Sequence, residues 1–314
     1  MYPSEIKDKT IIIAPLDWGM GHATRCIPLI HQLIEQNNTV VFAGTELQIS
    51  LIVKDFPEIT CEAIQGYNVS LDSGKPTYLQ MISQFGKLKT VIREEQEIAE
   101  QLVKKYKADV VISDNRYGFR SNSTLCIIMT HQLEVPLPVL KQFVNKRIRR
   151  HIEQFNICWI PDNEMGSYCG EMVVPSLKIP KLFIGLLSRF KPEVGENVYH
   201  YLVIISGPEP ERSVFARKVI QLANNSQKKI GIVAPFDLDY APSFTNPSTK
   251  ELNQLINQSK TIISRAGYTT IMEMITLEKK AILIPTKGQF EQEYLAKTVR
   301  SEYLKFCELS NIQF

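Results

Sequence analysis

The chain has 314 residues, of which 44% are hydrophobic and 22% are charged, and its formal net charge at pH 7 is +3. This composition is typical of a folded globular protein long enough for two domains, and the small charge argues against nucleic-acid binding. No apolar run reaches the roughly 18–20 residues that span a bilayer, and the first residues lack the pattern of a signal peptide. Six cysteines lie scattered without a CxxC pair, which indicates free thiols and a cytoplasmic location.

The first half of the chain alternates short apolar runs with amphipathic segments. The apolar runs are predicted strands at residues 11–15, 39–43, 60–64, 110–113, 126–129 and 158–160. The segments between them are predicted helices at residues 22–36, 45–54, 77–106 and 137–154. Strands that alternate with helices in this way indicate a parallel sheet with helices on both faces.

The second half repeats this plan. Its predicted strands are residues 182–186, 201–206, 230–234, 261–263 and 281–284, and its predicted helices are residues 211–224, 248–257, 269–277 and 289–305. Residues 166–180, between the halves, contain two glycines and two prolines without periodicity, which is typical of a linker. The sequence therefore predicts an α/β protein of two Rossmann-like domains, residues 1–165 and 181–314, whose parallel sheets face each other across a cleft.

A loop in the second half connects a predicted strand to a predicted helix and has the chemistry of a diphosphate site. The loop and the first turn of the helix comprise Ser264, Arg265, Ala266, Gly267, Tyr268 and Thr269. Backbone N–H groups at a helix N-terminus lack intrahelical partners, and the helix dipole is positive there, so the position suits a diphosphate. Glu273 follows one turn later, within reach of a ribose, and the segment indicates half of a nucleotide-sugar site.

A second glycine loop lies near the start of the chain, again between a predicted strand and a predicted helix. It contains Asp17, Gly19 and Gly21, and His22 follows at the mouth of the helix. One such loop is weak evidence for a ligand site, but one in each half supports a site with contributions from both domains. We expect this loop to line the acceptor side of the site.

Three segments of the sequence resemble glycosyltransferases of the GT-B type, in the family 28 and family 1 group. They are WGMGHATR at residues 18–25, LVIISGPEPER at 202–212, and SRAGYTTIMEM with IPTKGQFEQEYLA at 264–274 and 284–296. This group includes transferases that act on the lipid-linked peptidoglycan precursor. The resemblance implies an inverting, metal-independent transfer of a sugar from a nucleotide diphosphate, UDP above all, to an acceptor hydroxyl. It implies no cofactor besides this donor substrate.

The resemblance also assigns donor-binding residues. It places Glu273 at the ribose hydroxyls, and it places Glu291 and Gln292, in one polar run with Gln289, at the donor sugar. Relatives carry a glutamine where this chain has Glu291, so the identity of the sugar stays open. Two further segments complete the predicted donor site: Ser206 and Gly207 form a turn that would face the phosphates, and Phe236 follows a strand where it would flank the base.

His22 is the candidate catalytic base, because the helix dipole at its position disfavours the imidazolium form. In the family 1 plan, an aspartate at the place of Asp114 orients this histidine and stabilises its protonated state. Other interpretations stay open: His22 can cap the helix or contact a phosphate, and Asp114 can start a turn. Asp17 is a rival base. His131 follows another strand, and it either lines the acceptor side or is satisfied within the fold.

Two further patterns bear on metals and membranes. Asp237-Leu238-Asp239 matches the DxD pattern of metal-dependent glycosyltransferases, but we interpret it as a polar loop and predict no metal site. Residues 141–150 combine an apolar side with five basic residues and no acid, which indicates either a peripheral membrane contact or simply a helix that covers the sheet. The basic residues are Lys141, Lys146, Arg147, Arg149 and Arg150.

Two other functions fit the same fold. A UDP-sugar 2-epimerase would need additional acids, for which Glu291 is available, and a non-catalytic GT-B protein would bind a nucleotide or glycan as a partner subunit. A dehydrogenase is disfavoured, because neither glycine loop reads GxGxxG. The predicted partners are a nucleotide-sugar donor and a glycan, lipid-linked or small-molecule acceptor.

Overall fold

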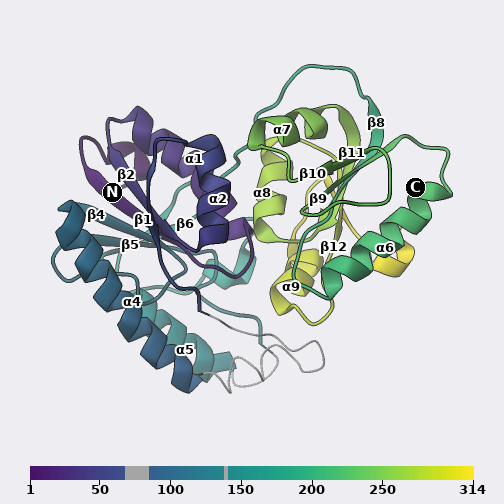
Figure 1. The fold of residues 1–314 in the computed structure, drawn as a ribbon. Coiled ribbons are helices and arrows are strands. Elements are labelled where there is room, and N and C mark those ends of the chain that lie inside the picture. Colours follow the sequence, from purple (N-terminus) through teal and green to yellow (C-terminus); the bar gives the residue numbers. More distant parts are fainter. Residues whose placement is uncertain (68–84, 138–140) are drawn as a thin grey trace. The chain divides into compact units, whose positions relative to one another are not determined.

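The computed structural model describes residues 1–67, 85–137 and 141–314, and it divides the chain into two compact units (Figure 1). The N-terminal unit is Met1–Leu187 and the C-terminal unit is Ser188–Phe314. Each unit is a parallel β-sheet with helices on both faces, so the predicted plan of two Rossmann-like domains is confirmed.

The N-terminal unit is built on a seven-stranded sheet with the order β3-β2-β1-β4-β5-β6-β7, in which every pair is parallel. Its strands are β1 (Thr10–Pro15), β2 (Thr39–Gly44), β3 (Thr60–Ala63), β4 (Val110–Asp114), β5 (Leu125–Met129), β6 (Ile157–Ile160) and β7 (Lys181–Phe183). Its helices are η1 (Pro3–Glu5), α1 (Gly21–Glu35), α2 (Glu46–Asp55), α4 (Phe85–Tyr106), α5 (Lys141–Ile152) and η2 (Gly170–Val173). Helices α1 and α2 cover one face of the sheet, and α4 and α5 cover the other (Figure 1).

The central strands of this sheet are continuous apolar runs, as expected where helices cover both faces. Ile11, Ile12 and Ile13 of β1 are fully buried, and so are Val111 and Ile112 of β4. The chain runs from β1 outwards to β2 and β3 and then returns to β4 on the other side of β1, so the strand order reverses between β1 and β4. In open α/β sheets, ligands bind beyond the carboxyl ends of the two strands at such a reversal.

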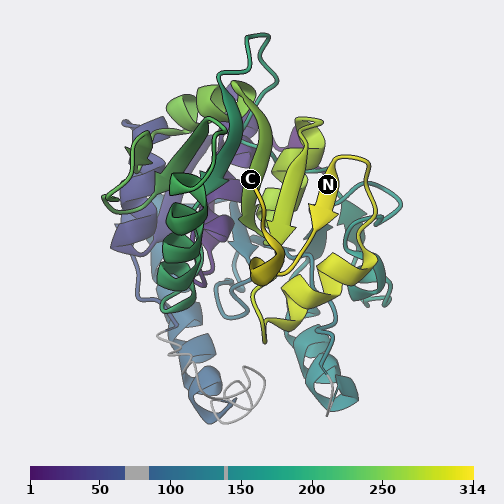
Figure 2. The same cartoon turned by 90° about the vertical axis from the view of Figure 1, so that its right-hand side faces the viewer.

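The C-terminal unit has a six-stranded parallel sheet with the order β10-β9-β8-β11-β12-β13. Its strands are β8 (Tyr199–Ile204), β9 (Ile230–Ala234), β10 (Ser243–Thr245), β11 (Ser259–Arg265), β12 (Ala281–Ile284) and β13 (Leu304–Phe306). Its helices are α6 (Glu211–Asn224), α7 (Thr249–Asn257), α8 (Tyr268–Thr276), α9 (Phe290–Thr298) and η3 (Leu309–Asn311). Helix α6 covers one face, as Figure 2 shows, and α7 and α8 cover the other; here the strand order reverses between β8 and β11.

The boundary between the units lies later than the sequence predicts. Strand β7 pairs with β6 and so extends the first sheet, although its residues begin the predicted second domain. The predicted linker, residues 166–180, also lies within the N-terminal unit, where the backbone N–H of Leu133 donates to Met172 O and that of Cys158 donates to Pro180 O. The glycines and prolines of this segment therefore form an irregular, packed connection, and the division falls after Leu187.

The last predicted helix also differs from the structure. The sequence predicts one helix over residues 289–305, but α9 ends at Thr298 and the chain then forms β13 beside β12. Exposed Lys305 lies between the partly buried Leu304 and Phe306, which is the period of a strand. The predicted helix segments at residues 77–84 and 138–140 lie outside the described residues. No helix within the described ranges combines the length and apolar character needed to cross a bilayer.

Candidate active site

The N-terminal loop and Asp114 meet at the strand reversal of the first sheet. Pro15, the last residue of β1, is in register with Asp114, the last residue of β4, and Leu16 N donates to Asp114 O over 2.8 Å. The loop that follows contains Gly19 with φ of +85°, a conformation that a glycine adopts without strain. Helix α1 then begins at Gly21, which places His22 in its first turn.

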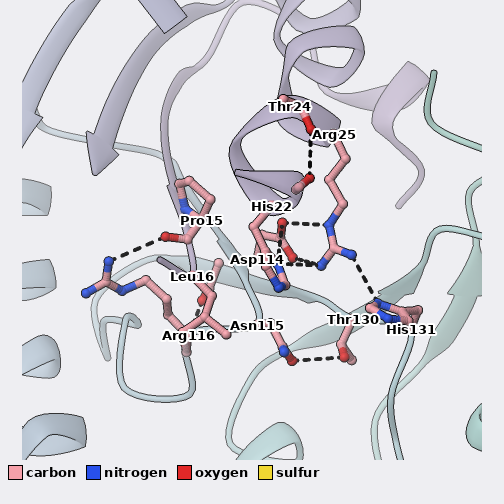
Figure 3. Close-up of polar contacts among 12 residues, drawn as sticks. Pro15, Leu16, His22, Thr24, Arg25, Asp114, Asn115, Arg116, Thr130 and His131 are labelled. Carbon is pink, nitrogen blue, oxygen red and sulfur yellow. Dashed lines mark hydrogen bonds and ion pairs between the residues drawn. The ribbon is translucent and has the colours of Figure 1, made fainter. Parts of the chain in front are cut away.

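Arg25 occupies the centre of this region, and the sequence interpretation did not foresee it (Figure 3). Its side chain reaches from α1 to Asp114, and its Nε and Nη2 atoms donate to the two carboxylate oxygens. The same guanidinium contacts two imidazoles: Nη2 lies 2.9 Å from His22 Nδ1, and Nη1 lies 3.0 Å from His131 Nδ1. The missed signal is the spacing: Arg25 lies three residues after His22, on the same helix face, within a run of buried residues.

Burial and charge set the protonation states of this cluster. The carboxyl of Asp114 is fully buried, which by itself opposes ionisation, but the charge of Arg25 outweighs this effect, and the pKa of Asp114 is lowered to about 2. The pKa of His22 is lowered by burial first and by the nearby Arg25 second, although Asp114 acts in the opposite direction. The site at rest therefore holds an ionised Asp114 and a neutral His22 at pH 7.

These shifts predict that the N-terminal unit loses stability in acid. The pKa of Asp114 falls from 3.8 to about 2 on folding, so its contribution of about 2 kcal/mol is complete above pH 4 and is lost as the pH falls towards 2. The lowered pKa of His22 acts in the same direction, and its contribution is lost as the pH falls below 6.5. Urea midpoints measured by tryptophan fluorescence test this, because both tryptophans, Trp18 and Trp159, lie in this unit.

The matched control for the loss of stability below pH 4 is Asp114→Asn, which keeps the shape of the side chain and removes its titration. Its stability is expected to fall less steeply than that of the wild type between pH 4 and pH 2. Parallel profiles for the two proteins would contradict the assignment.

Asp17 is held in place by a second buried network. Its Oδ1 accepts from the backbone N–H of Tyr67 over 3.1 Å, and the hydroxyl of Tyr67 donates to Glu95. Glu95 in turn forms a buried ion pair with Arg116, which also donates to Gln65 O. This network fixes the segment before residue 68 against the glycine loop, and the sequence interpretation missed it as well.

The C-terminal loop lies at the strand reversal of the second sheet. Strand β8 ends at Ile204 and leads to Ser206 and Gly207, while neighbouring β11 ends at Arg265. Gly267 is the N-cap of α8, in extended conformation and without a side-chain cap. The amide N–H groups of the first helical turn thus begin at the carboxyl end of β11, where an anion is favoured.

Three predicted donor residues of this loop make contacts within the fold. Ala266 N donates to Ile284 O over 3.1 Å, so this amide belongs to the sheet and not to the proposed phosphate site. The hydroxyl of Ser264 donates to Ile204 O on the adjacent strand. Arg265 is buried, with its Nη2 donating to Glu211 O at the start of α6, so it connects the end of β11 to the helix that follows β8. Tyr268 is also buried, whereas Thr269 is half-buried.

Glu273, the predicted ribose ligand, is paired with a residue that the sequence interpretation did not single out. It is 6% exposed, and its Oε1 lies 3.0 Å from Nε of Arg189. Burial raises the pKa of Glu273, and the charge of Arg189 opposes that effect. The arrangement holds one carboxylate oxygen in a defined position one turn into α8.

The predicted sugar-binding run forms a tight turn after β12. Thr286 N donates to Gln292 Oε1 over 2.9 Å, and the amide of Gln292 donates to Gln289. Glu291 and Gln292 are both half-buried in the first turn of α9. Phe236 lies after β9, and the guanidinium of Arg212 lies 5.6 Å from the centre of its ring.

The remaining patterns give no metal centre in the described parts of the chain. No group of three or more His, Cys, Asp or Glu side chains there is placed to hold a metal ion. Asp237 of the DxD pattern accepts from the hydroxyl of Thr245 over 2.7 Å. In α5, Val144 and Ile152 are buried and Phe143 is 63% exposed, and Arg149 pairs with Glu134, which precedes the helix.

Comparison with known proteins gives this geometry a family context. Residues 219–308 match the family description "Glycosyltransferase family 28 C-terminal domain". Two proteins described as uncharacterized glycosyltransferases also match, from Methanosarcina mazei with 21% identity and from Methanosarcina acetivorans with 23%. Each match covers 90% of this chain and 81% of the relative.

The chain is a glycosyltransferase of the GT-B type. Solved structures share its fold over nearly the whole length: spinosyn forosaminyltransferase SpnP matches with a TM-score of 0.61 at 11% identity, over 97% of this chain and 87% of that one. MurG of Acinetobacter baumannii matches with a TM-score of 0.54 at 14% identity, over the same two shares. Spinosyn rhamnosyltransferase SpnG, solved with thymidine diphosphate, matches with a TM-score of 0.57 at 11% identity, over 92% of this chain and 84% of that one.

Proposed function

We propose that this GT-B glycosyltransferase transfers a sugar from a nucleoside diphosphate, UDP above all, to an acceptor hydroxyl, with inversion and without a metal ion or other cofactor. The observation that carries the proposal is the β11–α8 loop at the strand reversal of the C-terminal unit. It joins a helix N-terminus, whose N-cap residue is Gly267, to a buried carboxylate, Glu273, one turn further on. A nucleoside diphosphate presents groups that match these two features in the same order. Its diphosphate is an anion that suits the helix N-terminus, and its ribose is a diol whose hydroxyls can donate to the carboxylate.

The leaving diphosphate gains negative charge during transfer, and preorganised donors stabilise that charge. The amides of the first turn of α8, beginning after Gly267, are the proposed donors. Ser206 and Gly207 follow the neighbouring strand β8 and supply a second turn at the same sheet edge. Glu291 and Gln292 are proposed to contact the sugar.

On the acceptor side, His22 is the proposed contact for the attacking hydroxyl, and Asp17 is the carboxylate of the same loop. The acceptor is proposed to be a glycan, a lipid-linked molecule or a small molecule. The exposed Phe143 among the basic residues of α5 supports a peripheral contact with an anionic membrane on the cytoplasmic side.

A thermal-shift screen with UDP, TDP, GDP and their sugars tests the donor proposal. A nucleotide present at 100 times its Kd should stabilise the protein by about 2.7 kcal/mol. The variant Glu273→Gln should bind the preferred nucleotide about 10- to 100-fold more weakly, because hydrogen bonds to charged groups contribute about 1.5–3 kcal/mol. Inorganic pyrophosphate, which lacks the ribose, should bind both proteins equally.

Three outcomes separate this proposal from its alternatives. A preferred nucleotide sugar that is consumed only with an acceptor supports transfer. Conversion of the free nucleotide sugar without an acceptor, with its nucleotide still attached, identifies an epimerase. Binding without turnover of any donor identifies a non-catalytic partner protein, and binding that Glu273→Gln leaves unchanged removes the assigned ribose contact.

A further inference from the structure

The guanidinium of Arg25 contacts both Asp114 and His22, so Asp114 is not the only group that can orient the imidazole. It is 2% exposed and engages both oxygens of the fully buried Asp114 through Nε and Nη2. Its Nη2 atom also lies 2.9 Å from His22 Nδ1, whereas the nearest carboxylate oxygen of Asp114 lies 3.2 Å from that nitrogen. One ring nitrogen therefore has both a cation and a carboxylate as neighbours, and the cation is nearer.

The two neighbours impose opposite protonation on Nδ1. A guanidinium has only N–H donors, so its partner must accept, whereas a carboxylate only accepts and needs a donor. The carboxylate of Asp114 already accepts one N–H group of Arg25 on each oxygen, so neither oxygen lacks a donor if the imidazole provides none. A neutral imidazole carries one proton, which then lies on Nε2 if Nδ1 accepts from Arg25.

We propose that Arg25, and not Asp114, sets the tautomer of His22, so that Nε2 carries the proton and the imidazole offers a hydrogen-bond donor to the ligand. Arg25 is thus a positioning residue that acts through His22. This hydrogen bond is assigned to the attacking hydroxyl of the acceptor, and that assignment rests on the proposed function.

Two other observations agree with this assignment. Burial and the charge of Arg25 both lower the pKa of His22, which keeps the ring neutral at pH 7. The same guanidinium also lies 3.0 Å from Nδ1 of buried His131, so one donor group faces the same nitrogen of two imidazoles.

The assignment changes the path of the proton in sugar transfer. The hydroxyl oxygen forms a bond to the anomeric carbon, and the bond from that carbon to the diphosphate breaks, with the electron pair leaving on the diphosphate. A hydroxyl that accepts from Nε2–H does not lose its proton to His22 in this tautomer. The proton passes instead to a carboxylate, and Asp17, held by the backbone of Tyr67, is the one that the same loop supplies.

The tautomer is measurable by ¹⁵N–¹H correlation spectra of the imidazoles in the full chain at pH 7.5, without any ligand. The variant His22→Gln assigns the signal. His200 is an internal reference for the Nε2–H form, because its Nδ1 accepts from the backbone N–H of Lys229 over 3.1 Å. We expect the Nε2–H pattern for His22 in the wild type and also in Asp114→Asn, and the Nδ1–H pattern in Arg25→Met, where Asp114 becomes the only partner of Nδ1.

An Nδ1–H signal for His22 in the wild type would overturn the proposal, and so would a change of tautomer in Asp114→Asn. Both measurements stand if Arg25→Met does not fold. The spectra need no substrate, so they remain decisive if the chain transfers no sugar; conversely, an active enzyme with Nδ1–H on His22 would refute the role of Arg25 and leave the transferase proposal intact.

Discussion

Replacing Arg25 with methionine is expected to destabilise the N-terminal unit by about 3–5 kcal/mol, because the substitution leaves the carboxylate of Asp114 buried without its cation. The lost packing of the aliphatic part of the side chain is small, since methionine replaces most of it. Urea unfolding followed by tryptophan fluorescence measures this change selectively, because Trp18 and buried Trp159 both lie in the N-terminal unit.

Two further variants identify the cause of that loss. In Arg25→Met/Asp114→Asn the buried charge is gone, so the double variant should be more stable than Arg25→Met alone. The control Arg93→Met removes an arginine whose partner is Glu97, in a pair with side chains 83% and 60% exposed, and it should change stability by less than about 1 kcal/mol. Equal losses for Arg25→Met and the control would show that the Arg25–Asp114 pair is not a buried ion pair.

Much of the fold follows from local pattern in the sequence. Runs such as residues 11–15 and 110–112 are apolar throughout, which is the composition of strands buried on both faces of a parallel sheet. Elements at the sheet edges were harder to predict. Strand β7 has three half-buried residues and follows a glycine- and proline-containing segment, and β13 has three residues after a helix, so neither gives a long periodic signal. Their membership of a sheet depends on pairing between residues distant in sequence.

The candidate site shows the same division between local and long-range information. The positions of the glycine loops, His22, Asp114 and Glu273 could be predicted, because strand–loop–helix order places them at carboxyl strand ends or in the first turns of the helices that follow. Their partners could not. From the sequence, Arg25 and Arg189 could equally well lie on the surface. Their partners, Asp114 and Glu273, are 89 and 84 residues away in the chain. A charge in a periodic apolar helix, as Arg25 is in α1, is the one local sign of a buried partner.

Replacing His22 with alanine is expected to lower the rate of nucleoside diphosphate release from the preferred donor, in the presence of acceptor, by about 100-fold. The hydrogen bond from His22 would hold the attacking hydroxyl in place, and a misplacement of about 1 Å at the reacting atoms costs about that factor. Donor affinity should stay unchanged, because the proposed nucleotide contacts lie in the C-terminal unit.

The variant His22→Gln then distinguishes two roles of His22, as a hydrogen-bond donor to the acceptor hydroxyl or as the base that takes its proton. The amide N–H of glutamine can replace Nε2–H, so a donor role predicts a rate within about tenfold of the wild type, the cost of one imperfect hydrogen bond. A base role predicts that glutamine loses as much as alanine, since an amide does not take up a proton at neutral pH, and the loss would then be about 10²- to 10⁴-fold in both variants. The two roles therefore differ in the ratio of the glutamine and alanine rates. That ratio is insensitive to any structural effect that the two variants share.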